Sequence, residues 1–479
     1  MARSIKNRYP FFLILLHVGI WLAACLPIKN RTQETLEIPQ SYGNRKDSSN
    51  IVELKWNHFI SDSNLTSLIS SSLSNNQDLL ISLQRIETYK ADVLYNKGLL
   101  WPTLSANGSL AQRRFGKYTM DGAGNASTPI YGGKLIPTDL PDYYLGFQSS
   151  WEIDIWGKLR SRKKAAFNRL LASIEGRNLI ITQLIYETAL AYYEIIALDN
   201  ELDVVNKTIQ IQQKALSVIQ IQKESGRANE LAVQQFEAQL LKTKSRKVQI
   251  IQSILEWENK INFLLGRFPQ AIVRDKNHLT DTLHLNLSVG LPSSLLLNRP
   301  DIRQAESELA ASKADAQATR MAFLPSFNIT GNSGFQSFKP DLLFITPASI
   351  TYGIMGNLSA PLLNRSALKA SYKNANARQQ EAFYNYQKAI INGYVEVYNE
   401  VNNLRNLAQI VKYKEEQSNL LSKAIETSAE LFSTGRANYL EVLFTQQNAL
   451  EAQLELIESR KRQAISGISL YKALGGGWK

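Results

Sequence analysis

Cysteine and histidine are scarce in this chain of 479 residues, and their scarcity excludes several classes of protein. The single cysteine, Cys25, cannot form a disulfide within the chain. His58, His278 and His284 are scattered, without a cysteine partner or the ligand spacing of a metal site. We therefore expect no catalytic site, no metal and no cofactor, and we predict that the chain is not an enzyme.

The chain also lacks an apolar run long enough to cross a membrane as a helix. The longest candidate, residues 11–25, contains His17 and falls short of the ~20 residues that a spanning helix needs. Basic residues precede this run and small residues end it, which predicts a signal peptide over residues 1–24. The end of the run, Leu22-Ala23-Ala24-Cys25, resembles a bacterial lipoprotein box, which predicts a lipid on Cys25. An incidental thiol after an ordinary signal peptide is the alternative.

Blocks of like charge are missing as well. The formal net charge is +12, but the basic residues are interleaved with acidic ones along the chain. This pattern is typical of solvated helix surfaces and gives no reason to expect nucleic acid as a partner.

Proline is absent from two long segments, residues 142–268 and 362–479. Because proline inside a helix costs about 3 kcal/mol, such segments permit very long helices. Apolar residues recur at helical spacing within them, as Val204, Ile211 and Val218 do. We predict helices over residues 63–100, 160–224, 228–265, 299–323, 367–433 and 437–474. The helix over 160–224 would be roughly 97 Å long at ~1.5 Å per residue.

What the chain does contain is an internal duplication, in which landmarks of the first half recur in the same order in the second half. The early landmarks keep one constant offset, which pairs Lys90-Ala91-Asp92 with Lys313-Ala314-Asp315. The later ones keep a slightly shorter offset, which pairs Gly226-Arg227-Ala228-Asn229 with Gly435-Arg436-Ala437-Asn438. The duplication predicts one helix-and-strand unit present twice, over residues 63–266 and 291–474. The remaining segments of the mature chain are residues 25–62, 267–290 and 475–479.

Each repeat also contains one predicted hairpin, over residues 102–156 and 325–362. In residues 143–155, for example, apolar and polar side chains alternate, as expected for a strand with two unlike faces. A soluble antiparallel sheet that covers a helical core is the alternative. In a bilayer, however, no sheet edge can stay open and the smallest barrels have eight strands, so four strands per chain require partners. Three copies would give twelve strands and more room for transport than two copies.

With these parts in place, the chain resembles the TolC-like outer-membrane factor family, in particular its NodT-type efflux lipoprotein branch. The resemblance covers nearly the whole mature chain. It is carried by residues 291–306, which include Asn298-Arg299-Pro300-Asp301, by residues 323–327 and by residues 435–443. It implies a mainly α fold with a small β part, in which a homotrimer forms a twelve-stranded outer-membrane β-barrel and a periplasmic α-barrel. The segments outside helices and strands would form an equatorial region of mixed structure.

The resemblance also implies the function and the partners. The chain would be the exit duct of a tripartite efflux system, a passive conduit for small molecules. Its partners would be outer-membrane lipid, a periplasmic adaptor protein and, indirectly, an inner-membrane transporter. In the family the hairpin tips meet the adaptor, which assigns that contact to Gly226, Arg227, Ala228, Gly435, Arg436 and Ala437. A plain glycine-capped turn is the alternative for either tip alone.

Related ducts close their tunnel just inside the second tip with acidic and apolar rings. Leu440 and Glu441 match those rings by position. Three copies of Glu441 would repel one another and attract cations. The chain departs from the family pattern at Phe444, where many relatives carry Asp, so either a more apolar gate or simple packing between helices is open at that position.

Two other functions stay open at this point. The chain could be the duct of a protein-secreting type I or ATP-driven exporter, or a periplasmic coiled-coil lipoprotein scaffold without a pore. The scaffold does not explain four alternating segments at the same places in two repeats. The exported cargo is not specified by the sequence, because the inner-membrane pump selects it.

Overall fold

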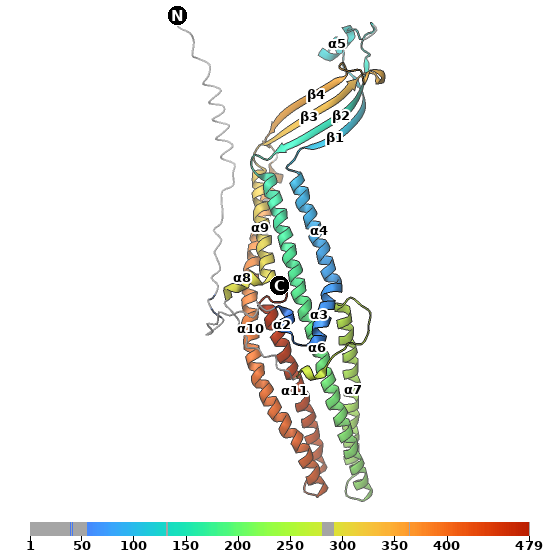
Figure 1. Ribbon diagram of the computed structural model, residues 1–479, viewed down its shortest axis with the longest axis vertical. Coiled ribbons are helices and arrows are strands. Elements are labelled where there is room, and N and C mark those ends of the chain that lie inside the picture. The colour runs from blue at the N-terminus through green and yellow to red at the C-terminus, as the bar shows by residue number, and fades with distance from the viewer. Residues whose placement is uncertain are drawn as a thin grey trace. The chain divides into compact units, whose positions relative to one another are not determined.

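The computed structural model describes residues 39, 41, 55–130, 133–279, 292–363 and 365–478. They form a mainly helical chain with one four-stranded antiparallel sheet, which confirms the expected fold class (Figure 1). The chain divides into two compact units. The first, here the sheet unit, contains Thr88–Leu170 and Ser307–Phe383; the second, the helical unit, contains Thr35–Glu87, Leu171–Glu306 and Tyr384–Lys479.

The duplication appears in the lengths of the helices. The short helices α4 (Gln77–Gly98) and α9 (Pro300–Met321) both have 22 residues. The long helices α6 (Lys158–Glu224) and α10 (Ser366–Ser433) have 67 and 68 residues. The return helices α7 (Glu230–Leu264) and α11 (Tyr439–Ala473) both have 35 residues. The corresponding helices are related by the two offsets seen in the sequence. The first offset relates α4 to α9, and the second relates α6 to α10 and α7 to α11.

The segment predicted as one helix over residues 63–100 is interrupted at Asn76. Helix α3 (Ser63–Asn75) ends there and α4 begins, because the Asn76 backbone is extended, with φ −64° and ψ 127°. The Asn76 side chain accepts a hydrogen bond from the amide of Leu79 and so caps α4. In the second repeat Pro300 begins α9, where the missing N–H of proline costs nothing.

Short elements fill the connections. They are α2 (Trp56–Phe59), α5 (Met120–Ser127), α8 (Leu295–Asn298) and the single 3₁₀ turns η2 (Lys276–Leu279), η3 (Pro292–Ser294) and η4 (Pro340–Leu342). Helix α5 lies in the long loop of the first hairpin and is capped by Thr119, whose side chain accepts a hydrogen bond from the amide of Gly122. The corresponding loop of the second hairpin is shorter, which explains why the second offset is smaller than the first.

The sheet has the strand order β1 (Thr103–Arg114), β2 (Asp139–Ile153), β3 (Ser326–Ser337) and β4 (Ile350–Ser359). Each repeat supplies one hairpin, and β2 pairs with β3 where the repeats meet. Strand β2 ends before residue 155, the end predicted from the alternation, and β4 ends before residue 362, the predicted end of the second hairpin. Strand β2 ends at Ile153, since the amide of Ile155 bonds back to the carbonyl of Ile153, and β4 ends at Ser359, two residues before Pro361.

The two faces of the sheet differ as the alternation predicts. Residues that are paired across strands lie on the same face, so Leu145 with Phe335 belongs to an apolar face and Gln148 with Asn332 to a polar one. No residue of the four strands is buried, and the strands β1 and β4 each have one edge without a neighbouring strand in the described chain. Among the described residues, no further layer of the chain covers either face of the sheet.

The main hydrophobic core lies in the helical unit. Most of its buried members come from α3, α6 and α7, and they include Leu65, Ile69, Tyr192, Ile195 and Ile261. Helix α6 contains an 18-residue window that is apolar enough to cross a membrane, with a mean hydropathy of 1.2. Because 56% of that window is buried, the apolar residues of α6 are explained by this core.

Candidate functional site at the hairpin tips

The two hairpin tips have the same backbone geometry. Gly226 and Gly435 take left-handed φ values of +71° and +74°, which favour glycine. The next residue donates its amide to a carbonyl five residues earlier, 2.8 Å from Arg227 N to Gln222 O and 2.8 Å from Arg436 N to Leu431 O. This bond defines a Schellman turn, which satisfies the last carbonyls of each long helix.

The asparagine of the repeated tetrapeptide starts each return helix. The side chain of Asn229 accepts from the amide of Ala232 at 3.0 Å, and that of Asn438 accepts from the amide of Glu441 at 3.1 Å. Local turn chemistry therefore accounts for the glycine and the asparagine. It does not account for the two arginines between them.

Arg227 and Arg436 are exposed at the tips. In the part of the chain that the structure describes, neither guanidinium group has a hydrogen-bond or ion-pair partner. A Cβ atom added to Gly226 or Gly435 would meet no atom within 4 Å. Each tip thus presents a cation and an open backbone surface.

The predicted gate residues lie on the first turns of α11. Leu440 is half-buried, Glu441 is exposed, and the Phe444 side chain is 58% exposed. Glu441 also has a local role that the sequence reading missed, because its carboxylate accepts from the amide of Asn438 at 3.2 Å. Together with the Asn438 side chain this contact forms a capping box, whose signature Asn-x-x-Glu is visible in the sequence.

A hydrophobic cluster brings the two hairpins together behind their tips. Ile219 of α6, Phe236 of α7 and Val442 of α11 are buried in it, and Ala228 and Leu443 pack against it. Two of the six residues assigned to the adaptor contact, Ala228 and Ala437, are half-buried, and the other four are exposed. Within the helical unit, residues of both hairpins are therefore packed together just behind the exposed tips.

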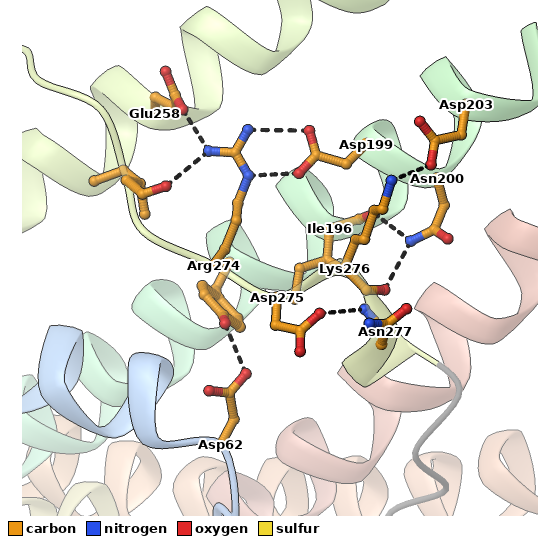
Figure 2. Close-up of polar contacts among 12 residues, drawn as sticks. Asp62, Ile196, Asp199, Asn200, Asp203, Glu258, Arg274, Asp275, Lys276 and Asn277 are labelled. Carbon is orange, nitrogen blue, oxygen red and sulfur yellow. Dashed lines mark hydrogen bonds and ion pairs between the residues drawn. The ribbon is translucent and has the colours of Figure 1, made fainter. Parts of the chain in front are cut away.

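A set of ion pairs fastens the segment after α7 to the helical unit, and Figure 2 shows its contacts. Arg274 donates to both carboxylate oxygens of Asp199, at 2.6 and 3.0 Å, and to Glu258. Burial alone would lower the pKa of Arg274, but the hydrogen bonds to Asp199 and Glu258 raise it. Lys276 pairs with Asp203 on the next turn of α6. These residues position the predicted equatorial segment and are not part of the tips.

A second buried arginine, Arg299, joins three parts of the second repeat. It bonds Asp301 at 2.8 Å, Glu396 of α10 at 2.7 Å and the carbonyl of Ala473 at the end of α11 at 2.6 Å. Burial alone would lower the pKa of Arg299, but the two carboxylates raise it. The sequence motif Asn298-Arg299-Pro300-Asp301 gave the only signal for this contact.

Other predicted site residues lie apart from the tips or outside the described residues. Cys25 and the signal peptide are outside them. His58 is exposed at the end of α2. Among the described residues there is no group of three or more histidine, cysteine, aspartate or glutamate residues that could hold a metal ion.

Comparison with known proteins agrees with this architecture. The family model described as outer membrane efflux protein matches residues 68–267 and 291–476, which are the two repeats. The cation efflux system protein CusC of Escherichia coli O6:H1 is 25% identical over 471 residues, covering 96% of this chain and 98% of CusC. The solvent efflux pump outer membrane protein SrpC of Pseudomonas putida is 28% identical over 449 residues, covering 92% of this chain and 91% of SrpC.

A solved structure gives the same result for the fold. A crystal structure of CusC superposes with a TM-score of 0.79 at 24% identity, covering 95% of this chain and 100% of that chain. The family consists of channels rather than enzymes. The match over both repeats, together with the sheet that this chain leaves open, shows that the chain belongs to the outer membrane efflux protein family and is an efflux channel of the outer membrane.

Proposed function

We propose that this chain works as a homotrimer, a passive exit duct whose periplasmic tips contact the adaptor of an inner-membrane pump. The observation that carries the proposal is the sheet. Its two edges lack neighbours and neither face is covered within the described chain. A membrane tolerates neither open edges nor a barrel of only four strands, so copies must close the sheet together.

The geometry of the tips supports the contact with the adaptor. Both tips have the same turn, and each exposes an arginine without a partner among the described residues. A positively charged group of this kind fits carboxylates or backbone carbonyls on a partner surface. We therefore assign Gly226, Arg227, Ala228 and their counterparts Gly435, Arg436 and Ala437 to this interface.

For the gate, we propose a ring formed by Leu440, Glu441 and Phe444. The exposure of Glu441 and Phe444 on the same side of the α11 start, three residues apart, supports the assignment. Three Glu441 carboxylates near one axis would favour cations.

The charge of Glu441 can be tested apart from its capping role. Glu441→Gln keeps an oxygen that accepts from the Asn438 amide but removes the charge, so helix α11 should begin normally. We expect the cation preference of the purified channel in planar bilayers to fall markedly. Glu230→Gln, at an exposed site near the other tip, is the matched control and should leave selectivity unchanged. Unaltered cation selectivity in Glu441→Gln would remove Glu441 from the gate.

At the N-terminus, we propose that Cys25 carries a lipid that anchors the mature chain in the outer membrane. The sequence Leu22-Ala23-Ala24-Cys25 supports it. Cys25→Ser is expected to abolish incorporation of labelled palmitate and to remove the mass of the acyl chains from the N-terminal peptide. If mass spectrometry finds an unmodified Cys25 at the mature N-terminus of the unaltered protein, the anchor is wrong.

A further inference from the structure

The two repeats of one chain meet through contacts whose partners can be mapped onto the duplicated positions. In the sheet unit, Arg169 of α6 in the first repeat forms an ion pair with Asp315 of α9 in the second. By the first offset the counterpart of Asp315 is Asp92 on α4. By the second offset the counterpart of Arg169 is Arg378 on α10. The sequence therefore contains a second pair of opposite charges, Asp92 and Arg378, at the positions equivalent to those of Asp315 and Arg169.

Asp92 and Arg378 cannot form the equivalent pair within one chain, because the two repeats of a chain meet on one side only, where α6 of the first contacts α9 of the second. Asp92 and Arg378 are both exposed. In the part of the chain that the structure describes, neither side chain has an ion-pair partner. Asp92 and Arg378 therefore carry opposite charges at positions where each could pair with the other residue on a neighbouring chain.

The helical unit gives the same relation with different chemistry. Arg303 of α9 bonds Glu175 of α6 at 2.6 Å, and the counterparts of these two residues are Leu80 and Tyr384. Both counterparts are apolar or aromatic and exposed, Leu80 by 48% and Tyr384 by 56%. A polar contact within the chain thus corresponds to a matched apolar pair that the chain leaves exposed.

A second contact of the helical unit follows this rule. Lys472 of α11 lies 4.6 Å from the centre of the Tyr186 ring of α6. The counterparts are Phe263 on α7 and Val395 on α10, which are 65% and 46% exposed. Phe263 and Val395 are thus exposed apolar side chains at positions equivalent to those of Lys472 and Tyr186, which contact each other inside the chain.

The sheet unit shows the corresponding open junction. Strand β2 of the first repeat pairs with β3 of the second, whereas the equivalent edges of β4 and β1 have no neighbour in the described chain. In a closed ring of repeats, a contact between the two repeats of one chain alternates with a contact between repeats of neighbouring chains. Because corresponding helices of the two repeats have equal lengths, both kinds of contact can have the same geometry.

We propose that neighbouring copies of this chain join through a second version of the intrachain junction, in which Asp92 pairs with Arg378, Leu80 packs on Tyr384 and Phe263 packs on Val395 of the next copy. The inference rests on the proposed homotrimer and specifies its interface. Burial at this interface would cover the exposed apolar residues of α4, α7 and α10.

A charge swap tests the ion pair. Asp92→Arg and Arg378→Asp should each place like charges at all interfaces and reduce severalfold the fraction of trimers that survives mild heating in detergent. The double variant restores opposite charges and should return this fraction close to that of the unaltered protein. The matched control, Arg169→Asp with Asp315→Arg, swaps the pair within one chain and should leave the trimers intact.

Cysteine pairs test the apolar contact independently of charge. Leu80→Cys with Tyr384→Cys should form disulfides between chains on mild oxidation, visible as a ladder of dimers and trimers in a non-reducing gel. Leu83→Cys with Tyr384→Cys moves one partner along the same helix and should link much less. Glu175→Cys with Arg303→Cys should link within a single chain and leave its mass that of a monomer.

The outcomes separate the interface from the assembly. If the unaltered protein is not a trimer by native mass, the homotrimer itself is wrong. If it is a trimer but the charge swap is no better than the single variants, or if the cysteine pair fails to link neighbouring chains, the proposed junction is overturned and the homotrimer stands.

Discussion

Arg299→Met is expected to destabilise the helical unit by about 3–5 kcal/mol, the cost of removing one partner from a buried ion pair. Arg299 is buried, with only 10% of its side chain exposed, and it bonds two carboxylates and the carbonyl that ends α11. Methionine fills similar volume but leaves Asp301 and Glu396 without their cation. The large effect comes from these uncompensated groups rather than from lost packing.

The first repeat supplies the matched control for this variant. There the counterpart of Arg299 is Asn76, which donates to the carbonyl of Leu264 at 3.0 Å without an ion pair. A cavity of about 270 Å³ lies beside it, lined in part by Asp78 and Glu187, the counterparts of Asp301 and Glu396. Asn76→Ala removes the hydrogen bond to Leu264 and the Asn76 cap of α4 but breaks no ion pair, so it should cost less, about 1–3 kcal/mol.

Denaturant unfolding of the purified protein, followed by far-ultraviolet circular dichroism, gives both free energies under the same conditions. Arg299→Lys keeps the positive charge but cannot bond all three groups at once, so it should fall between the unaltered protein and Arg299→Met. A loss for Arg299→Met that is no larger than the loss for Asn76→Ala would contradict the role assigned to the ion pairs.

Gly435→Trp is expected to abolish export while the trimers stay intact. No atom lies within 4 Å of a Cβ placed on Gly435, so the indole enters solvent and not the chain's own core. The left-handed φ of +74° adds a local strain of roughly 1–2 kcal/mol, which does not reach the packed cluster behind the tips. The side chain should instead obstruct the surface that we propose as the contact with the adaptor.

The direct readout is the amount of adaptor recovered with the channel after cross-linking in cells. We expect at least a tenfold loss, since about 1.4 kcal/mol of lost contact energy already weakens binding tenfold. Gly435→Asn is the matched control, because asparagine tolerates the left-handed conformation and is small. Normal export by Gly435→Trp at normal trimer levels would refute the assignment of this tip.

The architecture could be predicted from the sequence because its signals are long and repeated. The absence of proline from residues 142–268, and landmarks such as Gly226-Arg227-Ala228-Asn229 that recur in the second repeat, constrain helices and their order. The comparisons confirm the family, the fold class and the outer-membrane location that were expected. They also exclude the scaffold without a pore, since the family consists of efflux channels.

The structure added contacts that no local pattern predicts. Arg274 meets Asp199 across 75 residues, and Arg299 meets the carbonyl of Ala473 across 174 residues. Such pairs depend on which faces the packed helices turn to one another, which sequence periodicity does not specify. The break at Asn76 was missed because one residue in an otherwise helical segment decides it.

Glu441 combines an observed helix-capping contact with the gate role that we propose. Its position next to the second tip suggested a gate, whereas its contact with Asn438 is ordinary helix capping. The two roles are compatible, because capping fixes the carboxylate at the start of α11. The sequence offered both signals, and only the geometry connects them.

The native mass of the unaltered protein, extracted from outer membranes in mild detergent, is the critical measurement for the trimeric duct. Four strands per chain, with both sheet edges open in the described residues, require that copies close the barrel together. We predict a particle of three copies, and a stable monomer or dimer would contradict the trimeric duct.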